Sequence, residues 1–244
     1  MVSKNQIKLI TSLQQKKYRK EHKLFVAEGR KVIQELLRSH FELEKLFATS
    51  ASAILPDIDP SKAAIVSESD LKKISALSAA NDCLAVFKIP SPKKISASGL
   101  VVALDDIRDP GNLGTIVRLC DWFGVEEVVC SEETADIYNP KAVQATMGSI
   151  ARVNVSYLNL GEFISGSGLP VFGTFMDGEN IYKAVLPQEG ILIMGNEANG
   201  ISKAVATLAE HKISIPRFGA LQKAESLNVA AATAILLSEF RRNS

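Results

Sequence analysis

Apolar and polar positions along the chain follow two periods, and these periods predict helices and strands in turn. In the first ninety residues, helical spacing covers 4–20 and 30–38, and a further helix capped by Ser69 or Asp70 runs through residue 77. Short apolar runs bounded by polar turns predict the strands 24–29, 44–49, 63–67 and 83–89. The pattern therefore predicts a small α/β domain of about four strands.

A segment rich in proline and serine, IPSPKKISASG at 89–99, interrupts the pattern and is typical of a linker. After it, apolar strands and helices alternate more regularly. The predicted strands are 100–107, 125–131, 151–158, 170–176, 190–196 and 212–216, and the predicted helices are 113–123, 140–147, 202–211 and 226–242. Such alternation favours a mainly parallel sheet covered on both faces. We predict three parts: a domain at 1–90, a linker at 91–98 and a second domain at 99–244.

Composition supports a folded protein and excludes several classes. The chain has 244 residues, of which 46% are hydrophobic, so one large domain or two small ones have enough apolar residues for a core. No apolar run reaches the roughly 20 residues that cross a bilayer. The three cysteines are far apart and form no CxxC pair, which argues against a disulfide framework or a thiolate metal site. We expect a cytoplasmic protein without a membrane partner.

Charge is distributed unevenly between the two parts. Residues 1–98 hold 17 basic and 10 acidic side chains, whereas the remainder holds 11 and 17. Nine of the basic residues lie within 1–31, beside only Glu21 and Glu28. The excess predicts an arm that binds a polyanion, although a solvated helix face is an equally good explanation of charge alone.

Common catalytic motifs are missing from the sequence. There is no GxxxxGK[ST] loop for nucleotide hydrolysis, no GxGxxG after the first strand of the second domain, no HExxH and no GxSxG. The three histidines, His22, His40 and His211, are scattered and offer no metal site. These absences argue against a nucleotide hydrolase, a dinucleotide-dependent oxidoreductase, a zinc protease and a serine hydrolase.

Three segments place glycine and polar residues where predicted strands end, which is where ligands bind in open α/β sheets. They are DPGNLGTIVRLCDWFG (109–124), ILIMGNEANGIS (191–202) and SIPRFGALQKAESLNVAAATAILL (214–237). In the first, Asn112 is a candidate helix cap and Arg118 follows on the second turn. Each segment alone has an ordinary explanation as a strand-to-helix turn, with Ser202 or Ser226 as a cap. Their combination favours a ligand site.

Together the three segments resemble the motifs of the SpoU-type branch of the SPOUT-class RNA methyltransferases. The pattern N-x-G-x-x-x-R is met by Asn112, Gly114 and Arg118, in order. An apolar strand that ends in G-N-E-x-x-G is met by Gly195, Asn196, Glu197 and Gly200, followed by Ile201. The third motif is I-P followed by a glycine loop and S-L-N-V. It is met by Ile215, Pro216, Gly219, Ser226, Leu227, Asn228 and Val229. In the first domain, the stretch KYRKEHKLFVAEGRKVIQELL (17–37) resembles the small, ribosomal-protein-like substrate-binding domain that precedes many members, which implies such a domain at 1–90.

The resemblance implies a fold, a cofactor and a partner. The fold is α/β, with a mainly parallel sheet and a C-terminal trefoil knot, an exception to the rarity of knots. S-adenosylmethionine is the implied methyl donor, without a metal, and the implied assembly is a homodimer whose site is shared between subunits. The residues implied on the donor side are Thr174, Gly195, Asn196, Gly200, Ile215 and Leu227. Those implied on the substrate side are Asn112, Arg118, Glu197, Ser226 and Asn228.

Our prediction is a methyltransferase that modifies a ribose 2′-hydroxyl of RNA, with ribosomal RNA preferred over transfer RNA. Arg118 is expected to hold a phosphate and stabilise the developing alkoxide, because a guanidinium remains protonated at ordinary pH; a role as the base stays open. A non-catalytic RNA-binding protein with the same fold is the alternative. The sequence also departs from the family's usual pattern: the loop 217–225 is long, Arg217 replaces an apolar residue, and Ala230 replaces a serine.

Overall fold

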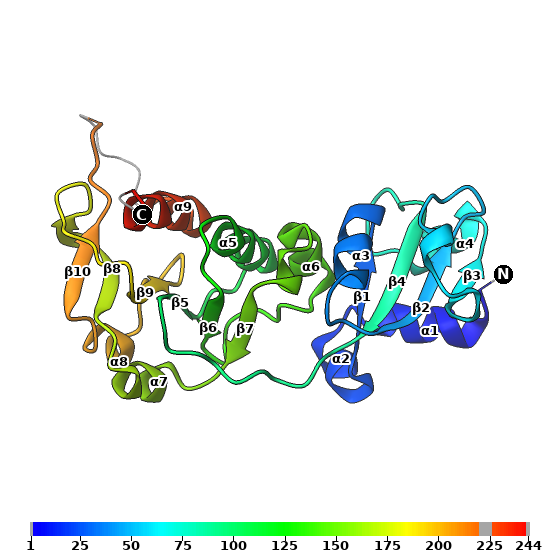
Figure 1. Ribbon diagram of the computed structural model, residues 1–244, viewed down its shortest axis with the longest axis horizontal. Helices are drawn as coiled ribbons and strands as arrows, with labels where there is room; N and C mark the ends of the chain where they lie inside the picture. The colour runs from blue at the N-terminus through cyan, green and yellow to red at the C-terminus, as the bar shows by residue number, and fades with distance from the viewer. Residues whose placement is uncertain (1, 220–225, 243–244) are drawn as a thin grey trace. The chain divides into compact units, whose positions relative to one another are not determined.

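The computed structural model describes residues 2–219 and 226–242 of the chain (Figure 1). Two compact units share these residues. The first comprises the residues up to Pro92 together with Asp136–Ala151, and the second comprises Lys93–Ala135 and the residues from Arg152 onward. The stretch 136–151 therefore packs with the first unit, although it lies within the second domain predicted at 99–244. Those predicted boundaries stay a prediction.

A four-stranded sheet forms the centre of the first unit, in the order β1-β4-β2-β3. β4 is antiparallel to both β1 and β2, and β3 is parallel to β2. The strands are β1 (Leu24–Glu28), β2 (Leu43–Ala48), β3 (Ala63–Ile65) and β4 (Cys83–Lys88). The helices of the unit are α1 (Lys4–Ser12), α2 (Lys16–His22), α3 (Arg30–Leu37), α4 (Glu68–Ile74) and α6 (Pro140–Thr146), with 3₁₀ turns η1 (Leu55–Asp57), η2 (Pro60–Lys62) and η3 (Ser149–Ala151).

Helices α1 and α4 bury their apolar sides together with residues of the sheet. Ile10 and Leu13 pack with Leu71 and Ile74 in one cluster that also includes Val26 of β1. α6 packs with β1, where the ring of Tyr138 lies 4.9 Å from the ring of Phe25. The basic segment, over its described residues 2–31, therefore packs as part of the domain and is not a separate arm. Its charge remains outside, since eight of its nine basic side chains are exposed.

A sheet of six parallel strands forms the centre of the second unit, within the residues that the structure describes. Its order is β10-β8-β9-β5-β6-β7, and every neighbouring pair is parallel. The strands are β5 (Leu100–Asp105), β6 (Glu127–Cys130), β7 (Asn154–Tyr157), β8 (Val171–Asn180), β9 (Gly190–Gly195) and β10 (His211–Ser214). The predicted α/β fold with a mainly parallel sheet is thus confirmed. The expected trefoil knot is consistent with this fold.

Helices cover both faces of this sheet. α5 (Pro110–Trp122) and α9 (Val229–Phe240) lie side by side on one face, whereas α7 (Leu160–Ser167) and α8 (Lys203–Ala206) lie on the other (Figure 1). The central strands are apolar and fully buried: β5 is buried along its whole length. This is the pattern of a parallel sheet with two covered faces. The carboxyl ends of β5, β9 and β10 lead into the segments that carry the sequence motifs.

Several predicted elements differ from the observed ones. The helix predicted at 4–20 is two helices, because the hydroxyls of Thr11 and Ser12 donate to backbone carbonyls and the first helix ends there. The helix predicted to start at Ser69 or Asp70 is capped by Ser67 instead. The helix predicted at 202–211 spans only α8, and the one predicted at 226–242 is α9, capped by Asn228. α7 was not predicted.

None of the helices in the described part of the chain is long and apolar enough to cross a membrane. The three cysteines are buried and free. Burial raises the pKa of the Cys83 thiol to about 12 and raises the pKa of Cys120 and Cys130 as well. These thiols therefore stay protonated near neutral pH.

Candidate active site

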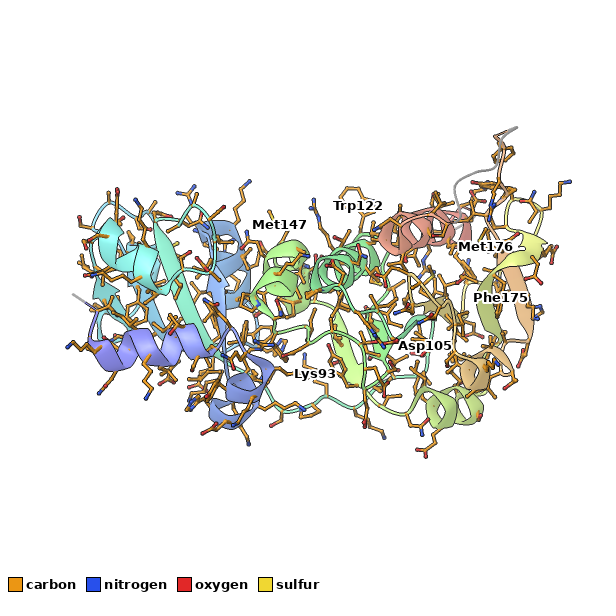
Figure 2. The ribbon with its side chains drawn as sticks, turned by 180° about the vertical axis from the view of Figure 1, so that it is seen from behind. Lys93, Asp105, Trp122, Met147, Phe175 and Met176 are labelled. Carbon is orange, nitrogen blue, oxygen red and sulfur yellow. The ribbon has the colours of Figure 1, made fainter. Side chains whose placement is uncertain are left out.

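A cavity of about 1060 Å³ lies in the second unit, between the ends of β8, β9 and β10 and the start of α9. Its lining is more apolar than polar. The predicted donor-side residues that line it are Thr174, Gly195, Asn196, Gly200, Ile215 and Leu227. All six residues predicted on the donor side therefore surround one cavity. Figure 2 labels two further lining residues, Phe175 and Met176, on β8.

Gly195 gives the cavity a wall made of backbone. A Cβ atom at this position would lie 2.3 Å from the carbonyl carbon of Gly200 and from the nitrogen of Ile201. No side chain fits there, so the end of β9 and the following loop approach each other at backbone distance. Gly200 closes the loop with a φ of +68°, a conformation that favours glycine. Their spacing in the motif is therefore a steric requirement of this loop.

The side chain of Asn196 holds the loop that follows β9. Its Nδ2 donates to the carbonyl oxygen of Asp106 (2.7 Å), and its Oδ1 accepts from the backbone nitrogens of Ala198 (2.9 Å) and Asn199 (3.1 Å). The residue is 8% exposed. Because these bonds use both ends of the amide, the side chain shapes the cavity wall and is not available to a ligand.

Two further side chains are also engaged in holding the walls. The hydroxyl of Thr174 donates to the carbonyl of Ile193 (3.0 Å), which joins β8 to β9. A carboxylate oxygen of Asp105, at the end of β5, accepts from the backbone nitrogen of Ser202 (2.7 Å). Asp105 was not singled out from the sequence. A sequence feature could have indicated this residue, because two successive aspartates, 105 and 106, end an apolar run.

A chain of hydrogen bonds joins the three sequence motifs. Nδ2 of Asn228 donates to Oδ1 of Asn112 (3.0 Å), and Nδ2 of Asn112 donates to Oε1 of Glu197 (2.8 Å). Oδ1 of Asn228 also accepts from the nitrogens of Ala230 and Ala231, so this residue caps α9. Residues 116 positions apart in the sequence thus meet at one point. The carboxylate of Glu197 is exposed at the end of this chain of bonds.

The position of Asn112 had suggested a helix cap, but Asn112 does not cap α5. The cap is Asp109, whose carboxylate accepts from the backbone nitrogen of Asn112 (2.9 Å). Because Asp109 caps the helix, the side-chain amide of Asn112 forms no bond to the start of α5 and instead bridges Glu197 and Asn228. Asp109 satisfies one of the unpaired N–H groups of the first turn.

Arg118 and Ser226 are exposed and stand apart from this network. Ser226 lines the cavity, whereas Arg118 does not. Within the described residues, Arg118 forms neither a hydrogen bond nor an ion pair, so its guanidinium is free to bind an anion. Trp122, one helical turn further along α5, is 84% exposed and projects away from the helix (Figure 2). The arginine thus shares an open helix face with an exposed aromatic ring.

The sequence did not single out every residue of the cavity. Met176, Met194, Phe218 and Leu236 also line it, as does Arg217, which was noted in the sequence only as a departure from the family's pattern. Arg217 and Phe218 follow the predicted pair Ile215-Pro216 directly, so their position was the available signal. Residues 220–225 of the long loop predicted at 217–225 lie outside the described residues. In the part of the chain that the structure covers, no cluster of three or more His, Cys, Asp or Glu side chains could hold a metal.

Comparison with known proteins places this fold and site in one family. The model of the SpoU rRNA methylase family matches residues 99–238, and that of the MRM3-like substrate-binding domain matches residues 4–85. The chain therefore belongs to the SpoU rRNA methylase family, with a substrate-binding domain before the methylase domain. The resemblance predicted from the three motifs is confirmed.

Similar proteins are known over the full length of the chain. A 23S rRNA (guanosine(2553)-2′-O)-methyltransferase, RlmP of Bacillus subtilis, is 30% identical over 98% of this chain and 97% of its own. A structure from Porphyromonas gingivalis, assigned to the TrmH family, is 40% identical, covers 100% of both chains and has a TM-score of 0.90. An AdoMet-bound rRNA methyltransferase from Sinorhizobium meliloti is 30% identical, covers 99% of this chain and 97% of its own, and has a TM-score of 0.88.

Proposed function

We propose that this protein transfers a methyl group from S-adenosylmethionine to a ribose 2′-hydroxyl of ribosomal RNA. One observation carries the proposal: the bonds among Asn112, Glu197 and Asn228 join the three motifs at the edge of a cavity that all six predicted donor-side residues line. The full-length relatives named as rRNA methyltransferases favour ribosomal over transfer RNA.

The cavity fits the proposed donor in size and lining. Its volume of about 1060 Å³ lies slightly above the usual range of about 300–1,000 Å³ for small-molecule sites, so it has room for a ligand of the donor's size. Apolar side chains such as Met194, Leu227 and Leu236 suit an adenine ring, and the backbone at Gly195 permits the close approach that a ribose or an amino-acid group requires. The donor supplies a methyl carbon that the sulfonium has already activated.

What remains for the protein is to place the hydroxyl oxygen, to let its proton leave to solvent as the new O–C bond forms and the S–C bond breaks, and to stabilise the charge that develops on the oxygen. We assign Arg118 to the RNA phosphate and to the developing alkoxide, because its guanidinium is exposed and forms no bond among the described residues. The Asn228–Asn112–Glu197 chain of hydrogen bonds orients the Glu197 carboxylate toward the substrate side. Ser226 holds the substrate or the donor from the loop before α9.

Arg118 lies outside the cavity of its own chain, and a homodimer explains this position. Trp122 is 84% exposed on α5, and the adjacent α9 has a mainly apolar exposed side, where Ala231, Ala234 and Ile235 are open to solvent in whole or part. We propose that the α5–α9 face packs against a second copy and that Arg118 then serves the partner subunit's cavity. Burial of an exposed tryptophan is typical of the centre of an interface.

The proposed reaction is tested by incubating the protein with labelled S-adenosylmethionine and ribosomal RNA and then digesting the RNA to nucleosides. A label recovered in a 2′-O-methylated nucleoside supports the proposal. Labelled base-methylated nucleosides would favour a different enzyme, and binding of RNA without transfer would favour the non-catalytic alternative.

Light scattering on the purified protein tests the dimer. We expect twice the chain mass, and a Trp122→Glu variant should have the mass of the monomer.

A further inference from the structure

Helix α2 in the first unit and the residue that caps its C-terminal end, Lys23, expose a group of unpaired positive charges. We call Lys16, Lys17, Lys20 and Lys23 the α2 lysine group. All four side chains are exposed, and none has an ion pair within the described residues. One acidic residue, Glu21, lies among them. Like charges so close together repel one another, so this arrangement adds nothing to the stability of the fold.

The orientation of α2 is fixed by its remaining basic residue. Arg19 is 2% exposed and donates to Oδ2 of Asp136 from Nε (2.8 Å) and from Nη2 (2.6 Å). Its Nη1 donates to the carbonyls of Leu13 (2.8 Å) and Gln14 (2.9 Å). The two kinds of basic residue in α2 therefore differ. One guanidinium is paired and structural, and it holds the helix so that the four lysines face solvent.

Two aromatic rings lie beside these lysines. The rings of Tyr18 and His22 are 6.4 Å apart and nearly parallel, with an interplanar angle of 16°. Nζ of Lys17 lies 5.7 Å from the centre of the Tyr18 ring. Stacked aromatic rings beside cations are the means by which proteins bind unpaired nucleotides: the cations contact phosphates and the rings stack on bases. In a duplex the bases are paired and stacked on one another, so they cannot stack on these rings, and only the contacts between lysines and phosphates remain.

We infer that the α2 lysine group and the Tyr18–His22 pair bind a single-stranded segment of the RNA substrate. The inference rests on the proposed function for the identity of the polyanion as RNA. Phosphates lie on Lys16, Lys17, Lys20 and Lys23, and a base stacks against the exposed ring of His22. An acidic protein partner would use the same charges but would not need the rings.

The test measures binding of the full-length protein to fluorescent RNAs by anisotropy, across a range of salt concentrations. The RNAs are a short single strand and a hairpin duplex of equal charge. The test variant is Lys16→Gln/Lys20→Gln. The matched control is Lys8→Gln/Lys72→Gln, which removes two exposed lysines of the same unit that also lack ion pairs among the described residues.

The expected change follows from counterion release. Each contact with a single-strand phosphate contributes about 0.7 to the slope of log K against log salt. Loss of two contacts should lower the slope by about 1.4 and weaken binding about 25-fold at roughly 0.1 M salt. The control should change little. Test and control variants that behave alike would show that the α2 lysine group is a solvated surface or serves a protein, and would overturn the inference.

A third variant tests the stacking component. His22→Ala should weaken single-strand binding about fivefold or more, because stacking contributes about 1–3 kcal/mol per base, and the salt slope should not change. Binding of the duplex should be unaffected. If His22→Ala binds the single strand as tightly as the unaltered protein, or if the duplex loses as much affinity, the assignment to single-stranded RNA is wrong.

Failure of this inference can be told apart from failure of the proposed function. Calorimetry with S-adenosylmethionine is run on the unaltered protein and on each variant, and donor binding should be the same in all. If the unaltered protein binds donor and methylates RNA while the lysine variants match the control, only the inference fails. If the unaltered protein neither binds the donor nor methylates RNA, the proposed function fails, and the RNA binding curves still decide the role of α2.

Discussion

Gly195 offers a sharp test of the donor cavity, because the structure shows what a single methyl group would meet there. In Gly195→Ala, the added Cβ would lie 2.3 Å from two backbone atoms, at Gly200 and Ile201, whereas ordinary contact begins at 3.4 Å. The overlap is about 1.1 Å. Since backbone atoms cannot swing aside as a side chain does, the loop after β9 has to move by a similar distance.

The magnitude follows from that overlap. Overpacking of this kind costs about 1–3 kcal/mol, which lowers the melting temperature of a chain of this size by about 2–12 °C. The displaced loop is the wall of the cavity, so a comparable loss appears in donor affinity. We expect S-adenosylmethionine to bind about 10- to 100-fold more weakly, since each factor of ten corresponds to about 1.4 kcal/mol.

The assay is calorimetric titration of S-adenosylmethionine, accompanied by a thermal melt. Gly166→Ala is the matched control: it adds the same methyl group within α7, where no atom lies within 4 Å of the new Cβ. This control should bind donor normally. It should also melt at or above the temperature of the unaltered protein, since alanine favours a helix. Normal donor affinity in a folded Gly195→Ala would refute the assignment of this cavity to the donor.

Three further predictions concern other parts of the molecule. Arg118→Ala should slow methyl transfer by about 100-fold or more with donor affinity unchanged, and Arg118→Lys should rescue little, as single-turnover kinetics would reveal; near-normal rates would remove Arg118 from the mechanism. Arg19→Met should leave the Asp136 carboxylate, whose side chain is 14% exposed, without its cation and lower the free energy of unfolding in urea by up to about 3 kcal/mol, whereas equal stability would contradict a structural role for this ion pair. The thiols of Cys83, Cys120 and Cys130 should resist a thiol reagent at pH 8 until the protein unfolds, because burial raises the pKa of each; rapid labelling of the native protein would contradict this.

The strands of the second unit could be predicted because they are continuous apolar runs, as in β5 and β9, and such runs are typical of strands buried on both faces. α7 could not be predicted in the same way. Its sequence, LGEFISGS, contains two glycines and a short apolar stripe, and its stability depends on packing of Leu160 and Ile164 against the sheet. The weak helix propensity of glycine hides such an element from a reading of periodicity.

The candidate site, too, could be predicted from the sequence only in part. The glycines at 195 and 200 indicate a close backbone approach, and the resemblance to the family motif predicts that they lie on the donor side. The bonds from Asn112 to Glu197 and Asn228 could not be read from the sequence, because they join residues 85 and 116 positions apart. The same holds for Asp136–Ala151, which packs with the first unit through Arg19 and Phe25. Long-range contacts of this kind depend on the folded topology.

The central claim is that the protein methylates a ribose 2′-hydroxyl of ribosomal RNA. It is tested most directly by mapping 2′-O-methyl groups in ribosomal RNA from cells that lack the gene and from the same cells supplied with it again. We predict that one 2′-O-methyl group disappears from ribosomal RNA in the deletion strain, returns with the intact gene and does not return with the Arg118→Ala gene. Unchanged 2′-O-methylation of ribosomal RNA in the deletion strain would contradict the account.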